Sequence, residues 1–178
     1  LRPVQVHSDV SSTGWSDWIS IVASEFHTCG VRTDGTGWCW GYDIYGGLGS
    51  NKASGDTGTA RPRRVLDSAG TGYWTDWVYI AAGGNSGSCG LRANGTAWCW
   101  GDNAGQIGDN TTNMSSLPVQ VHSSTSSTGW TDWTSISRGG HSCGARANGT
   151  VWCWGPDYYN QIGNGPTDSP TVRPSQVP

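Results

Sequence analysis

The sequence CGARANGTVWCWG, from Cys143 to Gly155, constrains the fold most strongly, because it occurs three times in the chain. The earlier copies are CGVRTDGTGWCWG, which begins at Cys29, and CGLRANGTAWCWG, which begins at Cys89. Each copy places an Asp-Gly or Asn-Gly turn between two runs in which small or polar residues alternate with apolar ones. Each copy therefore predicts a β-hairpin.

The two cysteines of each copy are expected to face each other across the hairpin. If the turn is a three-residue loop with Gly35 in the left-handed conformation, Arg32 faces Thr36, and counting outward places Cys29 opposite Cys39. This pair falls on a non-hydrogen-bonded rung, where side chains come closest, as a disulfide requires. The register predicts three disulfides: Cys29–Cys39, Cys89–Cys99 and Cys143–Cys153.

Two other states of the cysteines are open from the pattern. A two-residue turn would make the cysteines diagonal and the bridge strained, and the alternative to the disulfides is three reduced, buried cysteine pairs. A zinc site fits less well, because the thiols lack C-x-x-C spacing and no histidine recurs beside them in every copy. We therefore expect no metal and no cofactor.

The composition indicates an extracellular or cell-surface protein. The 178 residues carry a formal charge of −3, which argues against nucleic acid or an anionic membrane as a partner. Only 13% of the residues are charged, so Ser, Thr, Asn and Gly must solubilise the surface. No apolar run is long enough for membrane insertion. Six cysteines in equivalent hairpins favour an oxidising compartment, and hence secretion.

The hairpins lie on a longer repeat. Trp38, Trp98 and Trp152 are separated by 60 and 54 residues, a period of propeller blades or solenoids, and all 12 tryptophans fall on it, four per copy. Each copy offers a W-x-D-W strand, the two hairpin strands and a strand of the Pro-Val-Gln-Val type, and helical periodicity is lacking. The fold class is therefore all-β, with three four-stranded antiparallel propeller-type blades. The expected ranges are residues 9–66, 67–121 and 122–178, preceded by an orphan strand at 1–8.

The order I-x-x-G-G-H-S-C, G-T-V-W-C-W-G, Q-I-G and P-V-Q-V resembles the repeat of the regulator of chromosome condensation family, in a secreted, disulfide-bearing form. The resemblance covers essentially the whole chain and is closest in the third copy, at residues 136–163. It implies antiparallel blades around an axis, usually seven of them. The family's nucleotide exchange on a small GTPase needs a complete propeller and is the least favoured function here.

Three blades cannot close a ring, so the two outer blade faces are open to neighbours. The orphan strand adds to this, and its strand-exchange candidates are Pro3, Val4, Gln5 and Val6. The leading hypothesis is an incomplete propeller or open spiral completed by neighbouring subunits, that is, a head-to-tail extracellular homopolymer with a structural or scaffold role. A closed six-bladed dimer and a fragment of a longer propeller are the alternatives.

The W-[ST]-D-W motif repeats with two indoles around an acid: Trp15 and Trp18, Trp74 and Trp77, Trp130 and Trp133. The structural reading has the indoles packing between blades and Asp17, Asp76 and Asp132 accepting backbone N–H bonds at a turn. Arg32, Arg92 and Arg146 are candidates to stack on the indoles. The functional reading makes the indoles platforms for glycans, as in a lectin-like module. W-x-x-W also resembles the C-mannosylation signal.

Four asparagines fit the N-glycosylation pattern: Asn94, Asn110, Asn113 and Asn148. The hairpin turn already explains an Asn-Gly at 94 and 148, so Asn110 and Asn113, on a Ser/Thr-rich connector, are the better candidates. Catalysis finds little support, because the four histidines are scattered and no nucleophile triad or phosphate loop recurs. We therefore expect no enzyme activity.

Overall fold

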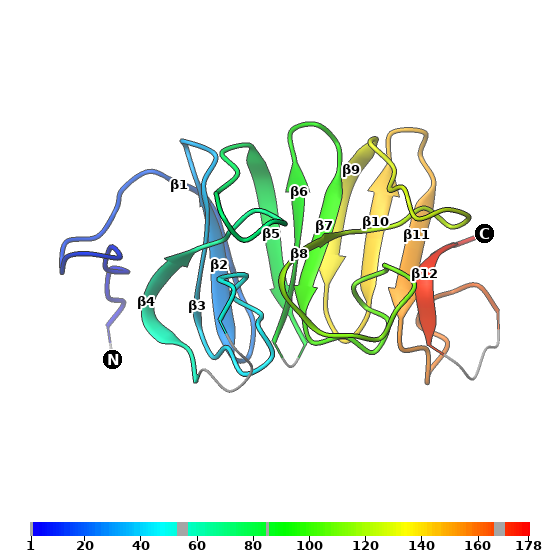
Figure 1. The fold of residues 1–178 in the computed structure, drawn as a ribbon, viewed down its shortest axis with the longest axis horizontal. Coiled ribbons are helices and arrows are strands. Elements are labelled where there is room, and N and C mark those ends of the chain that lie inside the picture. Colours follow the sequence, from blue (N-terminus) through cyan, green and yellow to red (C-terminus); the bar gives the residue numbers. More distant parts are fainter. Residues whose placement is uncertain (1, 53–56, 85, 166–169) are drawn as a thin grey trace.

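The computed structural model describes residues 2–52, 57–84, 86–165 and 170–178, and these residues form twelve strands and no helix. The strands form three separate four-stranded antiparallel sheets, each built from four consecutive strands. The sheets stand side by side as three blades, with the N-terminal segment beyond blade 1 and the C-terminus beside blade 3 (Figure 1). The predicted all-β fold of three propeller-type blades is confirmed. In the described part of the chain no helix could cross a membrane.

Each blade repeats the same strand order. Blade 1 consists of β1 (Trp18–Ala23), β2 (His27–Arg32), β3 (Gly37–Gly41) and β4 (Thr59–Arg64). Blade 2 consists of β5 (Trp77–Gly83), β6 (Gly87–Arg92), β7 (Ala97–Gly101) and β8 (Ser115–Gln120). Blade 3 consists of β9 (Trp133–Arg138), β10 (Ser142–Arg146), β11 (Val151–Gly155) and β12 (Thr171–Gln176). The first strands β1 and β5 contact each other, as do β5 and β9, so the blades converge along their first strands.

The hairpin turn fixes the register of the disulfides. Arg32 N donates to Thr36 O, and Gly35, with φ of 73°, adopts the left-handed conformation that glycine reaches without steric strain. Counting outward from this three-residue turn, Cys29 pairs with Cys39, and the corresponding pairing holds in the other two hairpins. The structure contains the three disulfides Cys29–Cys39, Cys89–Cys99 and Cys143–Cys153.

The hydrophobic cores lie between blades rather than within one. The first core joins Val31, Leu48 and Val65 of blade 1 to Trp77 and Trp100 of blade 2. The second joins blades 2 and 3 in the same way, with Trp133 and Trp154 from blade 3. A blade therefore buries its apolar face only when a neighbour covers it, and the two outermost faces of the chain have no such cover from its described residues.

The orphan segment differs from its prediction as a strand. Residues 2–6 belong to no strand, and a single bridge pairs His7 with Gly14. The segment then turns as the link between blades 2 and 3 does: Ser8 N donates to Thr13 O, as Ser123 N donates to Thr128 O. Val4 is 89% exposed. A strand needs a partner, and within this chain all three blades already have their fourth strand.

The disulfides yield a direct prediction. Non-reducing peptide mapping of the native protein should recover three bridged peptide pairs, each from a single hairpin. Removal of one bridge by a double Cys→Ser exchange should lower the free energy of unfolding by about 2–3 kcal/mol, because each bridge closes a short loop. Free thiols or bridges between different hairpins would contradict the register.

Candidate functional sites: arginine–tryptophan clusters and two end faces

A cluster of one arginine, one aspartate and two indoles occurs in every blade. In blade 1, Arg32 Nε and NH2 donate to the two carboxylate oxygens of Asp17, each at 2.9 Å. The guanidinium carbon lies 4.3 Å from the ring centroid of Trp15, which in turn lies 4.5 Å from the ring of Trp38. The arginine thus binds a carboxylate edge-on and an indole face-on, both favourable for a planar cation.

Blades 2 and 3 repeat this cluster. Arg92 pairs with Asp76 and stacks over Trp74 at 4.1 Å, and Arg146 pairs with Asp132 and stacks over Trp130 at 4.0 Å. The predicted stacking of arginine on the first indole of each motif is present. The expected partner of the aspartates was different: the carboxylates bind the arginine side chains, whereas turn N–H groups were expected. In each cluster the aspartate comes from the W-x-D-W turn and the arginine from the hairpin, so the ion pair joins these two motifs within one blade.

The first cluster affects one titration directly. The hydrogen bonds from Arg32 lower the pKa of Asp17, against a smaller opposing effect of desolvation. This carboxylate therefore stays ionised when the pH falls below the usual range of aspartate. Among the described residues no group of three or more His, Cys, Asp and Glu side chains could hold a metal ion.

The outer face of blade 1, which we call the head face, is defined by four residues: Trp18, Ile21, Thr28 and Trp40. Trp18 is the second tryptophan of the W-x-D-W motif, and Trp40 is the second tryptophan of the W-C-W run. The counterparts of Ile21 are Ile80 and Ile136, which are 0% and 4% exposed because the preceding blade covers them. Ile21 itself is 48% exposed. Trp18 is likewise only half-buried, whereas its counterparts Trp77 and Trp133 are buried.

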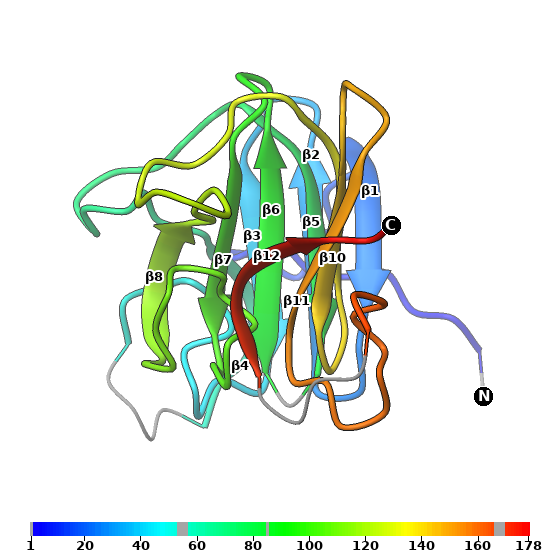
Figure 2. The ribbon, with the colours of Figure 1, turned by 90° about the vertical axis from the view of Figure 1, so that its right-hand side faces the viewer.

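The outer face of blade 3, the tail face (Gly149, Val151, Gln161 and Gly163), shows the complementary pattern. The counterpart of Val151 in blade 1 is Gly37, where an added Cβ would lie 2.6 Å from Ile80 Cδ1 of blade 2. The counterpart in blade 2 is Ala97, which is fully buried, but Val151 is 42% exposed. Seen from this end, β12 lies at the front, with no sheet before it (Figure 2).

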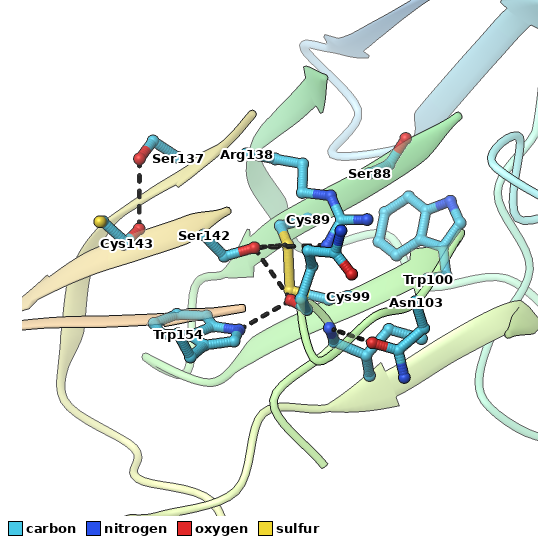
Figure 3. The surroundings of a disulfide bond; sticks show 12 residues. Ser88, Cys89, Cys99, Trp100, Asn103, Ser137, Arg138, Ser142, Cys143 and Trp154 are labelled. Carbon is cyan, nitrogen blue, oxygen red and sulfur yellow. Dashed lines mark hydrogen bonds between the residues drawn. A yellow bond between two sulfur atoms is a disulfide. The ribbon is translucent and has the colours of Figure 1, made fainter. Parts of the chain in front are cut away.

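At each junction between blades, two side chains of one blade donate hydrogen bonds to the same backbone carbonyl group of the blade before it. Trp154 Nε1 and Ser142 Oγ of blade 3 both donate to Gln106 O of blade 2, at 2.7 and 2.9 Å. Figure 3 shows Ser142 and Trp154 beside the Cys89–Cys99 disulfide. The blade 1–blade 2 junction is the same, with Trp100 Nε1 and Ser88 Oγ donating to Gly47 O at 2.8 Å each.

The ends of the chain carry the two halves of this arrangement. The counterparts of the donors are Trp40 and Thr28 on the head face, and the counterpart of the acceptor is Gln161 O on the tail face. A second hydrogen bond between blades is also repeated: Trp77 N donates to Gly35 O, and Trp133 N donates to Gly95 O, both at 3.0 Å. The acceptor at the equivalent position of the tail face is Gly149 O.

The buried His27 connects blades 1 and 2. Its Nε2 lies 2.9 Å from Ser88 Oγ, a hydroxyl that also donates to Gly47 O, and its Nδ1 lies 3.0 Å from Ser24 Oγ. Burial and, to a smaller extent, the positive charge of Arg138 lower the pKa of His27 to about 4, against the opposing effect of a backbone hydrogen bond with Gly87. Arg138 is itself buried in blade 3, where its NH2 donates to Asp102 O.

His27 should make the fold sensitive to acid. Its folded pKa is about 4 against an ordinary 6.5, so the unfolded chain binds more protons between these values. Stability is therefore full above pH 6.5 and falls by about 3 kcal/mol as the pH drops to 4. His27→Gln should remove this part of the slope in urea unfolding at a series of pH values. Ser88→Ala, which removes the partner but no titrating group, should lower stability about equally at each pH.

The glycosylation candidates lie at two kinds of position. Asn94 Oδ1 accepts from Thr96 N and Thr96 Oγ1, and Asn148 does the same with Thr150, so both asparagines serve the hairpin turn. Asn110 and Asn113 are exposed on the connector before β8. The exposure of all four side chains is compatible with modification, which is not tested.

Sequence reasoning missed the residues that join the blades, chiefly His27, Ser88 and Arg138, because their partners lie in other repeats. One signal was present at the end faces. The position before the W-C-W-G run is Gly37, Ala97 and Val151 in successive blades, so the largest side chain stands where no further blade constrains it.

Comparisons with known proteins agree with this architecture. The sequence model of the regulator of chromosome condensation (RCC1) repeat matches residues 18–46 and 77–106. These are the repeats of blades 1 and 2, whereas the motif comparison had placed the closest resemblance in the third copy. No curated protein sequence matches the chain.

Several solved structures share the fold at low sequence identity. Yeast RCC1 (Prp20) bound to Kap60 is 22% identical with a TM-score of 0.75, and the match covers 93% of this chain and 38% of that one. Prp20p from Saccharomyces cerevisiae, studied for binding to Gsp1p and histones, is 21% identical with a TM-score of 0.75, over 93% and 39%. Human WBSCR16 is 22% identical with a TM-score of 0.77, over 99% and 42%.

The chain thus spans about two fifths of the length of the propellers it matches. Its three disulfides indicate an oxidising environment. Residues 18–46 and 77–106 therefore match the regulator of chromosome condensation repeat, and the chain has a propeller-type fold of three blades.

Proposed function

We propose that this chain is a non-catalytic structural subunit of an extracellular head-to-tail homopolymer, in which the tail face of one copy covers the head face of the next. One observation carries the proposal: the two end faces are the complementary halves of an interface that the chain builds twice within itself. Ile80 and Ile136 are buried by the preceding blade, while Ile21 and Val151 stay exposed.

The contacts at this junction follow from the internal ones. Val151 would face Ile21 as the smaller Gly37 and Ala97 face Ile80 and Ile136; because even a Cβ at Gly37 would come within 2.6 Å of Ile80 Cδ1, the valine requires the two faces to lie farther apart at this point than inside the chain. Trp40 Nε1 donates to Gln161 O as Trp100 donates to Gly47. Since the head face supplies donors and the tail face supplies the acceptor, two copies join head to tail. Such an interface is heterologous and either closes a ring or propagates as a filament.

In this polymer, residues 2–6 pair with β11 of the preceding subunit. The segment RPVQV repeats RPSQV at residues 173–177, whose Ser175 pairs with Cys153 in β12. It already lies beside Trp40, since Val4, Val6 and Trp40 line one hollow. When residues 2–6 of one subunit pair with β11 of the preceding subunit, they displace β12 of that subunit. Val4 then takes the place of Ser175 and becomes partly buried, as the equivalent Val119 of β8 is partly buried against the second core.

Electron microscopy of native material tests the assembly. Filaments whose repeat matches one subunit support it, and discrete rings of two subunits favour the closed six-bladed dimer. A native chain much heavier than 18.8 kDa would instead assign the missing blades to the same polypeptide. Deletion of residues 2–8 separates the two parts of the proposal: filaments that persist reject strand donation but keep the face-to-face junction.

A lectin-like module is the second candidate, supported by the three repeated indole clusters. In each cluster the first indole is already in contact with a guanidinium group and with another indole, which leaves less ring surface for a sugar. A glycan array decides, because saturable binding at about three sites per chain would favour the lectin. We expect neither this nor nucleotide release from a small GTPase.

Glycans should supply the solubility that a surface poor in charge lacks. The intact mass of native material should exceed the bare chain, and Asn110→Gln and Asn113→Gln should each remove one glycan mass. Asn94→Gln is the matched control and should not change the mass by a glycan, because Asn94 Oδ1 accepts a hydrogen bond in the hairpin turn and that role already explains the Asn-Gly pair. A native mass of 18.8 kDa less six hydrogens would contradict the prediction.

A further inference from the structure

Blade 1 has a basic hollow at its outer edge. The hollow, with a volume of about 550 Å³, lies beside β4 and within the size range of small-ligand sites. Its lining includes four cations and two aromatic rings, with Asp9 as an acidic member: Lys52, Arg61, Arg63, Arg64, Trp38 and Tyr73. Four of the chain's ten basic residues thus gather at one place in a protein of net charge −3.

The fold does not require these residues. Arg64 pairs with Trp38 in the sheet, and the same pairing is made by Gln120 in blade 2 and Gln176 in blade 3. Tyr73, which follows β4, stands where both other links have glycine, Gly14 and Gly129. Because two blades fold with Gln and Gly at these positions, blade structure does not require Arg64 or Tyr73.

Two aromatic rings hold the Arg64 guanidinium group at the hollow. Its guanidinium carbon lies 4.4 Å from the ring centroid of Tyr73 and 5.7 Å from that of Trp38, so both rings orient the group. Arg64 Nε is buried and has no hydrogen-bond partner in the described part of the chain, so a ligand would be bound through the terminal nitrogens of the guanidinium group. By contrast, Arg63 lies 3.8 Å from Asp43, and Arg61 NH1 donates to Ser11 O.

We infer that this hollow binds a sulfate or carboxylate group of an acidic polysaccharide, with Arg64 as the main ligand-binding residue. A stacked guanidinium is suited to bidentate binding of such oxyanions, and Tyr73, 51% exposed, offers a ring against which a sugar packs. A nucleic acid fits less well, because the three disulfides indicate an oxidising environment such as the cell exterior, where acidic polysaccharides are the common polyanions. The inference is independent of the proposed assembly.

Titration calorimetry with a heparin oligosaccharide of defined length tests the site. Arg64→Gln, which copies both other blades, should weaken binding at least about tenfold through loss of a charged hydrogen-bond donor. Tyr73→Gly, also a copy of the other blades, should weaken it less. Arg173→Leu removes one positive charge from β12, copies Leu117 of blade 2, and should leave affinity unchanged. Uncharged dextran of equal length should not bind.

Each other outcome overturns the assignment. Equal weakening by Arg173→Leu and Arg64→Gln would show attraction by net charge alone. Unchanged affinity in Arg64→Gln, with retained near-ultraviolet circular dichroism of the tryptophans, would remove the site. Single-stranded DNA that binds more tightly than heparin would assign the hollow to nucleic acid, and inorganic sulfate that binds equally well would reduce it to an adventitious ion only.

Discussion

Ile21→Glu should stop head-to-tail assembly while each blade stays folded. Ile21 is 48% exposed in the single chain, so the exchange has little effect on the fold. In the polymer the same side chain lies against Val151 of the preceding copy, where a carboxylate loses its water without gaining a partner. The critical concentration for assembly should rise at least about tenfold. Sedimentation velocity and negative-stain electron microscopy measure the change.

Ile19→Glu is the matched control. Ile19 lies on the same strand and is 57% exposed, but its counterparts Val78 and Thr134 are also exposed, so no junction covers this position. It should assemble as the wild type does. Val151→Lys alone should block assembly like Ile21→Glu, and the double variant should partly restore it through the opposite charges. Filaments that form normally from Ile21→Glu would reject the face-to-face junction.

Trp77→Ala should produce the largest loss of stability, about 3–5 kcal/mol in the free energy of unfolding. The indole is 2% exposed and belongs to the core between blades 1 and 2. It lies so close over Gly90 that an added Cβ there would come within 2.4 Å of the ring. Removal of the ring therefore leaves a cavity that the sheet cannot close by a small shift. Urea unfolding followed by tryptophan fluorescence measures the loss.

Trp18→Ala tests the same position without a preceding blade. Trp18 is only half-buried in the single chain, so its removal should lower stability clearly less than that of Trp77. In assembled material, where a tail face covers Trp18, the losses of stability in the two variants should become similar. Equal losses in the dissociated chain would contradict the view that blades gain stability mainly from their neighbours.

The sequence by itself determined the blade. The Asp-Gly and Asn-Gly turns set the hairpin register, and register alone places Cys29 opposite Cys39, because both features depend on residues ten positions apart or fewer. The period of the tryptophans determined the number of blades, and the strand patterns determined the four strands of each. These properties depend on residues close together in sequence, and each occurs three times, so they could be predicted from the sequence alone.

Only the tertiary structure decided what joins the blades and what stays open. The burial of His27 and the carbonyl acceptors Gly47 and Gln106 depend on contacts between segments that are far apart in sequence. Strand formation at residues 2–6 was expected from β-prone residues, but a strand also needs a free edge, and all three blades have their own fourth strand. The contrast between buried Ile80 and exposed Ile21 has the same origin: identical residues in equivalent strands differ only in whether a further blade lies against them.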